Sequence, residues 1–240
     1  NFLSSFLESG MNVLDIGACF GVYALPMARA VSLSGQVFAF EPGSLAREHL
    51  EIGVKENNLD NVHVQPEGLS SLSGKAKLEP SPTPELNSIA NGSPSSQAKD
   101  IELTTLDEWW HQADCPQIDF VKLDANGHEA QIIQGGQEFF AQASPVVLVS
   151  IRHDEKVNQQ AIQALTDLDF EFYQYLPGPD ILARFDEEAE TEPYLLNLVA
   201  VRSDTALKFR DQGLIAPEQL EVPEPKPRCW EQCLVALPWT

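Results

Sequence analysis

The feature that most constrains the fold is a pair of apolar strand patterns, each followed at once by residues suited to binding a ligand. The first pattern, in a strand expected at 11–16, runs into a glycine-containing turn at 17–21, and the second, in a strand expected at 36–40, runs into Glu41. Near-continuous apolar runs of this length are typical of parallel strands covered on both faces. In an open sheet of this kind, ligands bind beyond the carboxyl ends of the strands. The chain therefore predicts an α/β fold with a ligand site between the two turns.

The spacing of the glycines indicates which class of ligand this site takes. Gly17-x-x-x-Gly21 differs from the G-x-G-x-x-G of dinucleotide binders, and the chain has no G-x-x-x-x-G-K-[ST] phosphate loop. A glycine turn at a helix amino end suits an amino-acid carboxylate, and an acid such as Glu41 suits the two hydroxyls of a ribose. We therefore expect S-adenosylmethionine (SAM) as the cofactor. Two alternatives stay open here: a nucleotide-dependent oxidoreductase on the same topology, and glycines that serve the turn alone.

Composition limits the partners. Lys and Arg number 15 against 36 Asp and Glu, a formal charge of -21, which repels nucleic acid and anionic membrane surfaces. No run of about 18 apolar residues suggests a membrane span, and no signal segment opens the chain, so we expect a cytoplasmic protein that binds neither nucleic acid nor membrane. Its four cysteines do not form a disulfide framework, and Cys229 with Cys233 makes too small a ligand set for a metal site. The oligomeric state stays unknown.

The rest of the chain predicts the remaining elements. Further strands are expected at 62–65, 118–123 and 145–151, with helices between them, and an antiparallel pair at 170–175 and 194–201 joined by an acidic loop. This predicts a doubly wound, mostly parallel seven-stranded sheet with a terminal antiparallel hairpin. Residues 66–99 form a long irregular segment, expected to be a lid, a binding loop or a disordered insertion. We expect one domain over 1–212, then a Pro-rich linker and the start of a truncated segment over 213–240.

Several separate blocks then resemble the FkbM family of methyltransferases. They are Leu14-Asp15-Ile16-Gly17-Ala18-Cys19-Phe20-Gly21-Val22-Tyr23, Ala39-Phe40-Glu41-Pro42, Thr105-Leu106-Asp107, Val121-Lys122-Leu123-Asp124-Ala125-Asn126-Gly127-His128-Glu129 and Pro145-Val146-Val147-Leu148. The resemblance covers roughly 11–201 and implies a Rossmann-like SAM methyltransferase fold that methylates a hydroxyl of a small-molecule or carbohydrate-like acceptor. It places the cofactor on Asp15, Gly17, Ala18, Gly21 and Glu41.

Catalytic residues are expected at the carboxyl ends of the central strands. A hydroxyl acceptor gains about 10²–10⁴-fold if a base removes its proton, and Asp124, His128 and His153 are the candidates. The chain departs from the family pattern at two places, with Asn126 and Ser150 where acids are common. Neither side chain replaces a carboxylate as a base or as a ligand of a hard cation. The alternative function is therefore a catalytically degenerate methyltransferase-fold binding domain within a larger chain.

Overall fold

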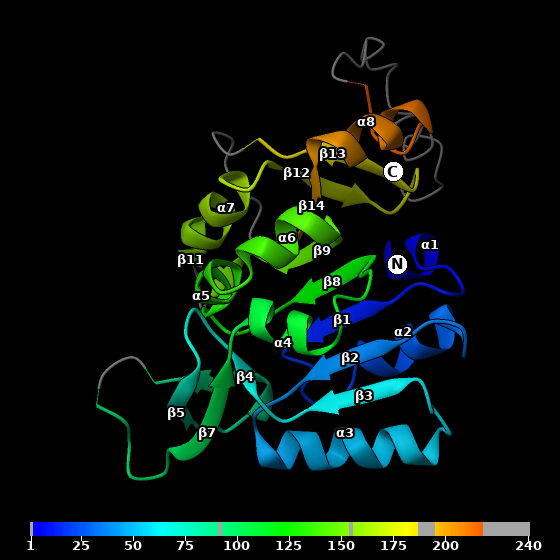
Figure 1. Ribbon diagram of the computed structural model, residues 1–240. Helices are drawn as coiled ribbons and strands as arrows, with labels where there is room; N and C mark the ends of the chain where they lie inside the picture. Colours follow the sequence, from blue (N-terminus) through cyan, green and yellow to red (C-terminus); the bar gives the residue numbers. More distant parts are fainter. Residues whose placement is uncertain (1, 91–92, 154–155, 187–194, 218–240) are drawn as a thin grey trace, which may run out of the picture.

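A computed structural model describes residues 2–90, 93–153, 156–186 and 195–217, and Figure 1 shows a central sheet with helices packed on its faces. The sheet order is β13-β12-β14-β9-β8-β1-β2-β3. Strands β3, β2, β1, β8 and β9 run parallel to one another, whereas β14, β12 and β13 follow β9 with each strand antiparallel to its neighbour. In chain order the strands are β1 (Val13–Ile16), β2 (Val37–Phe40), β3 (Val62–Gln65), β8 (Phe120–Leu123), β9 (Val146–Ser150), β12 (Phe170–Leu176), β13 (Ile181–Arg184) and β14 (Asn197–Arg202).

The α/β class is confirmed, but the described part of the sheet has eight strands and is mixed, where seven mostly parallel strands were expected. The additional strand, β13, pairs with β12 through a tight turn at 177–180, in the register Leu176↔Ile181. Strands β12 and β14 are antiparallel neighbours, as predicted. The acidic loop expected between them falls largely on 187–194, which lies outside the described residues.

Alternation along the strands produces two apolar cores, one on each face of the sheet. On β1, Leu14 and Ile16 face a core shared with helices α4 to α7, whereas Val13 faces a core shared with α1, α2, α3 and α8. The helices are α1 (Phe2–Phe6), α2 (Ala24–Val31), α3 (Ser44–Glu56), α4 (Leu106–Gln112), α5 (Glu129–Gln134), α6 (Gln137–Ala143), α7 (Gln159–Thr166) and α8 (Ser203–Asp211). Asp15 is buried on the second face, an uncommon position for an acid.

Two helix starts have simple local features. Helix α2 begins at Ala24 and therefore carries Pro26 in its first turn, where a missing N–H costs no intrahelical bond. Helix α3 begins at Ser44, after the N-cap Gly43, and has no side-chain capping bond.

The segment 66–99 folds as a second, smaller sheet beside the main one, apart from residues 91–92, which lie outside the description. Its order is β4-β7-β5-β6, formed by β4 (Gly68–Leu69), β5 (Gly74–Glu79), β6 (Ser88–Ile89) and β7 (Lys99–Thr104), with a short 3-10 helix, η1 (Pro84–Leu86). The interpretation of this segment as a disordered insertion is thus wrong for its described residues. Within this sheet, β7 lies between β4 and β5.

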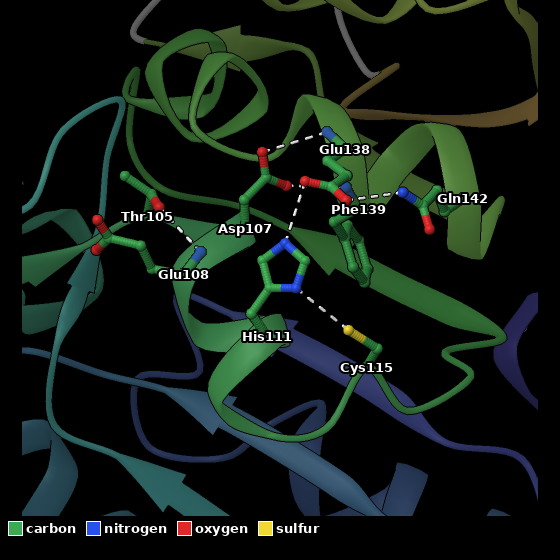
Figure 2. Close-up of polar contacts among 8 residues, drawn as sticks. All are labelled: Thr105, Asp107, Glu108, His111, Cys115, Glu138, Phe139 and Gln142. Atoms are coloured by element: carbon green, nitrogen blue, oxygen red, sulfur yellow. Dashed lines mark hydrogen bonds and ion pairs between the residues drawn. The ribbon is translucent and has the colours of Figure 1, made fainter.

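Helices α4 and α6 meet in a polar corner, which Figure 2 shows. Asp107 of α4 accepts hydrogen bonds from the backbone N–H groups of Glu138 (3.2 Å) and Phe139 (2.8 Å) in the first turn of α6. Beneath this corner, the ring of Trp109 lies edge-on to Phe40 at 5.2 Å. Trp109 thus packs in the core beneath the end of β2.

The chain remains packed after α8. Leu182 of β13 donates its N–H to Leu214 O and accepts the N–H of Ala216, both at 2.8 Å, and the intervening Ile215 is buried. The predicted boundary after residue 212 stays a prediction, and the expected linker and truncated segment beyond 217 lie outside the described residues. Among the residues that are described, no helix is long and apolar enough to cross a membrane.

Candidate functional site

A cavity of about 290 Å³ lies at the carboxyl ends of β1, β2 and β8. One side is formed by the turn after β1, and the opposite side by β6 and η1 of the small sheet, including Pro84, Asn87 and Ile89. The predicted residues Asp15, Gly17, Ala18, Glu41, Asp124 and His128 all line it. The structure therefore brings together in one place residues that the sequence distributes over more than one hundred positions.

Asp15 is the most unusual group in this cavity. Its side chain is 1% exposed, and neither carboxyl oxygen has a donor within strict hydrogen-bond geometry among the described residues. Burial raises its pKa from 3.8 to about 7, although the nearby Lys122 ammonium and the backbone N–H of Ala24 oppose that rise. A buried acceptor with so few donors is costly for the fold, so Asp15 is placed to receive a donor from a ligand.

Gly17 and Gly21 shape the turn in different ways. Gly17 has φ +81°, and a Cβ there would lie 1.9 Å from the carbonyl oxygen of Asp124, so only glycine fits at this crossing of two loops. Gly21 has φ +86° and faces Leu50 of α3. Gly21 is not among the residues that line the cavity. Its part in the cofactor loop is therefore to allow the shape of the turn, without contact with the cavity. Ala18 lines the cavity, and its N–H bonds to Phe40 O at 2.9 Å.

Glu41 closes the other end of the cavity and is 7% exposed. Its Oε2 accepts the N–H of Cys19 (2.8 Å) and its Oε1 accepts that of Gly43 (2.7 Å). Burial raises its pKa, and these two amides with Arg47 partly offset the rise. Each carboxylate oxygen has two lone pairs, so Glu41 is fixed by the backbone and still able to accept further hydrogen bonds from a ligand.

Lys122 connects Asp15 to Asp124. It is buried on β8, donates a 3.0 Å hydrogen bond to Asp124 Oδ2, and its ammonium lies 5.2 Å from the centre of the Tyr23 ring. Burial, together with Asp124 and Asp15, raises the pKa of Tyr23. The sequence interpretation overlooked Lys122, although a charged residue inside the run Phe-Val-Lys-Leu was a detectable signal. It also overlooked Asn87 and Ile89, which no local pattern connects to the cavity.

The three candidate bases have different surroundings. His128 is 9% exposed, its Nε2 lies 2.9 Å from Ser70 Oγ, and burial lowers its pKa, which favours the neutral ring that can accept a proton. Asp124 is 43% exposed and paired with Lys122. His153 falls in the short strand β10 (Arg152–His153), paired with β11 (Lys156–Val157), and its side chain lies outside the described part.

The two departures from the family pattern occupy different environments. Asn126 lines the cavity, and its Nδ2 donates to the carbonyl of Asn87 at 3.0 Å, which ties the loop after β8 to the small sheet. Ser150 is buried at the end of β9 and does not line the cavity. Glu129 accepts the N–H groups of Ala125 and Gly127, so it holds the loop.

The described cysteines lie in separate places. Cys19 lines the cavity, whereas Cys115 is exposed beside His111, with 3.3 Å between Sγ and Nδ1 (Figure 2). Cys229 and Cys233 lie outside the described residues. Within the described ranges, no group of three or more Cys, His, Asp or Glu side chains is arranged to hold a metal ion.

Comparisons with known proteins agree with this arrangement. The family model described as "Methyltransferase FkbM domain" matches residues 15–172. The solved structure of an FkbM methyltransferase from Methylobacillus flagellatus KT is similar, with a TM-score of 0.53, 13% identity, and coverage of 82% of this chain but only 44% of that one. A putative rRNA methylase from Clostridium thermocellum has a TM-score of 0.50 and 14% identity, over 84% of this chain and 90% of that one. The search of curated proteins found no match. At such low identity these likenesses show the fold alone.

Proposed function

This chain belongs to the FkbM family of methyltransferases, and from that premise we propose that it transfers the methyl group of SAM to a hydroxyl of a small-molecule or carbohydrate-like acceptor. The observation that carries the proposal is a cavity with a buried carboxyl at each end, Asp15 and Glu41. The unpartnered oxygens of Asp15 suit the cofactor's amino group, and Glu41 suits its ribose hydroxyls. These residues thus fit the cofactor.

The chemistry asks little of the protein. SAM supplies a methyl group already activated on a sulfonium, so holding the acceptor oxygen in line gives much of the acceleration. His128 is the preferred base for the acceptor hydroxyl, because its burial favours the neutral ring. Asp124 is the second candidate, and His153 remains a prediction. In this proposal the substrate reaches the cavity beside Val22, which lines it and is 72% exposed.

The acidity of the chain bears on the acceptor. A formal charge of -21 disfavours a nucleic-acid substrate, because neutralising phosphates supplies most nonspecific affinity. The rRNA methylase shares this fold, but we do not propose RNA as the substrate of this chain. We therefore propose that the protein binds neither nucleic acid nor membranes.

Glu41→Ala is the first test of the cofactor site. We expect it to weaken the binding of SAM and of its demethylated product by the same factor, about 10- to 100-fold, since the ribose is common to both and hydrogen bonds to a charged group contribute about 1.5–3 kcal/mol. Calorimetry measures both affinities, and the melting temperature reports folding. Glu51→Ala, an exposed acid of α3, is the matched control and should change neither affinity. Unchanged affinity in a folded Glu41→Ala protein would remove the ribose role.

A second candidate function is a binding domain that retains the cofactor and has lost turnover. The amide of Asn126 favours it, because that side chain holds Asn87 where the family commonly has an acid. SAM binding without methyl transfer to any hydroxylated compound in extracts, unrestored by divalent cations, would select this alternative. Tight binding of NAD without binding of SAM would instead favour an oxidoreductase.

A further inference from the structure

Lys122 is a charged residue at a position that the sheet otherwise fills with apolar side chains. It is 1% exposed, and on β8 it faces the same core as Phe120. In the parallel pairing of β1 with β8 its register partner is Asp15, so the two side chains project from the same face of the sheet. Burying an ammonium group costs several kcal/mol unless it is paired. The groups around Lys122 must therefore offset that cost.

Those partners carry more negative than positive charge. Asp15 from β1, Asp124 from the end of β8, Glu41 from the end of β2 and the Tyr23 hydroxyl before α2 are the titratable groups that face this point. Among the described cavity-lining residues, Lys122 is the one Lys or Arg. It donates to Asp124, while Asp15 has no side-chain donor within hydrogen-bond geometry among the described residues and only the backbone N–H of Ala24 nearby. One ammonium therefore lies beside two carboxyl groups and is hydrogen-bonded to one of them.

We propose that Lys122 is a positioning residue for the cofactor: its buried ammonium, beside Asp15 on the neighbouring strand and hydrogen-bonded to Asp124, favours the charged form of Asp15, which receives the amino group of SAM. This inference rests on the proposed function and adds a residue that acts through Asp15 without needing to touch the ligand. An opposite charge close to a carboxyl group commonly lowers its pKa by about 1–3 units. Lys122 accordingly sets the pH range in which the cofactor can bind.

The test is calorimetric titration of the full chain with SAM between about pH 6 and pH 9. Wild-type affinity should fall as the pH drops through about 7, where Asp15 takes up a proton. In Lys122→Met this fall should move to higher pH by about one unit or more, so that affinity is roughly tenfold lower near pH 7 and recovers near pH 9. In Asp124→Asn a competing negative charge is removed, and the fall should move to lower pH.

Opposite shifts in the two variants, with recovery of Lys122→Met in alkali, would support the inference, because a merely structural defect lowers affinity at every pH. A Lys122→Met curve that keeps the wild-type shape would overturn it. If circular dichroism shows that Lys122→Met does not fold, Asp124→Asn decides: a downward shift supports the inference and an unshifted curve overturns it. Wild-type protein that binds no SAM at any pH would overturn the proposed function itself, and this inference with it.

Discussion

The carboxyl group of Asp15 is a source of instability in the ligand-free domain. Its pKa in the folded chain is about 7, against an ordinary value of 3.8, because burial disfavours the charged form. Between about pH 4 and pH 7 the folded state thus binds a proton that the unfolded state releases, so this group destabilises the fold progressively as the pH rises through that range. At about 1.4 kcal/mol per pH unit, the shift corresponds to roughly 4 kcal/mol as an upper bound.

Asp15→Asn should therefore raise the free energy of unfolding while weakening the binding of SAM. We expect the variant to exceed wild type by up to about 4 kcal/mol at pH 8, with the difference shrinking toward zero near pH 4. Denaturant unfolding at several pH values measures this, and subtracting the two curves removes the contribution of all other titrating groups. A difference that stays constant with pH would contradict the charged, buried state of Asp15.

At the residue scale, the sequence was informative wherever a function needs a particular residue type at a strand end. Gly17 and Glu41 could be found because a turn and a ribose site each restrict the amino acids allowed. Lys122 was overlooked because the apolar pattern of a strand does not indicate what a single charged residue within it does. Asn87 could not be found, since its place beside Asn126 depends on how the small sheet packs.

At the element scale, the polar corner between α4 and α6 holds together two helices that pack on the core at the end of β2. Asp107→Ala should destabilise the domain by about 1–2 kcal/mol, because two N–H groups at the start of α6 lose their acceptor. This corresponds to a fall of roughly 2–8 °C in melting temperature for a chain of this size.

His111→Ala is the matched control for that corner (Figure 2). It removes a pair in which His111 and Glu138 are 50% and 46% exposed, and exposed pairs contribute little. We expect its melting temperature to fall by less than half as much. Equal losses in the two variants would show that the cap on α6 is not the important contact.

The elements themselves were predictable to the extent that their patterns are local. The main-sheet strands that line the cavity, β1, β2 and β8, are short apolar runs followed by Gly, Glu or Asp, and each was predicted close to its observed bounds. Strand β13 was missed because four residues after a Pro-Gly-Pro-Asp turn carry little periodicity. The order and pairing of the small sheet could not be predicted, because its Pro- and Ser-rich composition hides pairings that only long-range contacts stabilise.

For the whole molecule, the central question is where the folded unit ends. The sequence predicts a boundary after residue 212, from the change to Pro-rich composition. In the structure, 214–216 cover the outer edge of β13 with two backbone hydrogen bonds of 2.8 Å, and Ile215 is 6% exposed. An uncovered edge strand next to an unfilled apolar position is a liability for both stability and solubility.

Two shortened chains test whether the folded unit ends at residue 212 or includes residues 214–216. A chain of residues 1–217 should retain the melting temperature and SAM affinity of the 240-residue chain, because every described contact of the cavity and sheet is present. A chain of residues 1–212 should melt about 5–10 °C lower, because it loses the burial of Ile215, which contributes about 2–3 kcal/mol, and exposes the edge of β13. Its affinity for SAM at low temperature should stay unchanged, since the cavity lies at the opposite half of the sheet. Equal melting temperatures for the two chains would place the boundary at 212, and a loss of SAM affinity in either would mean that the cavity depends on the far edge of the sheet.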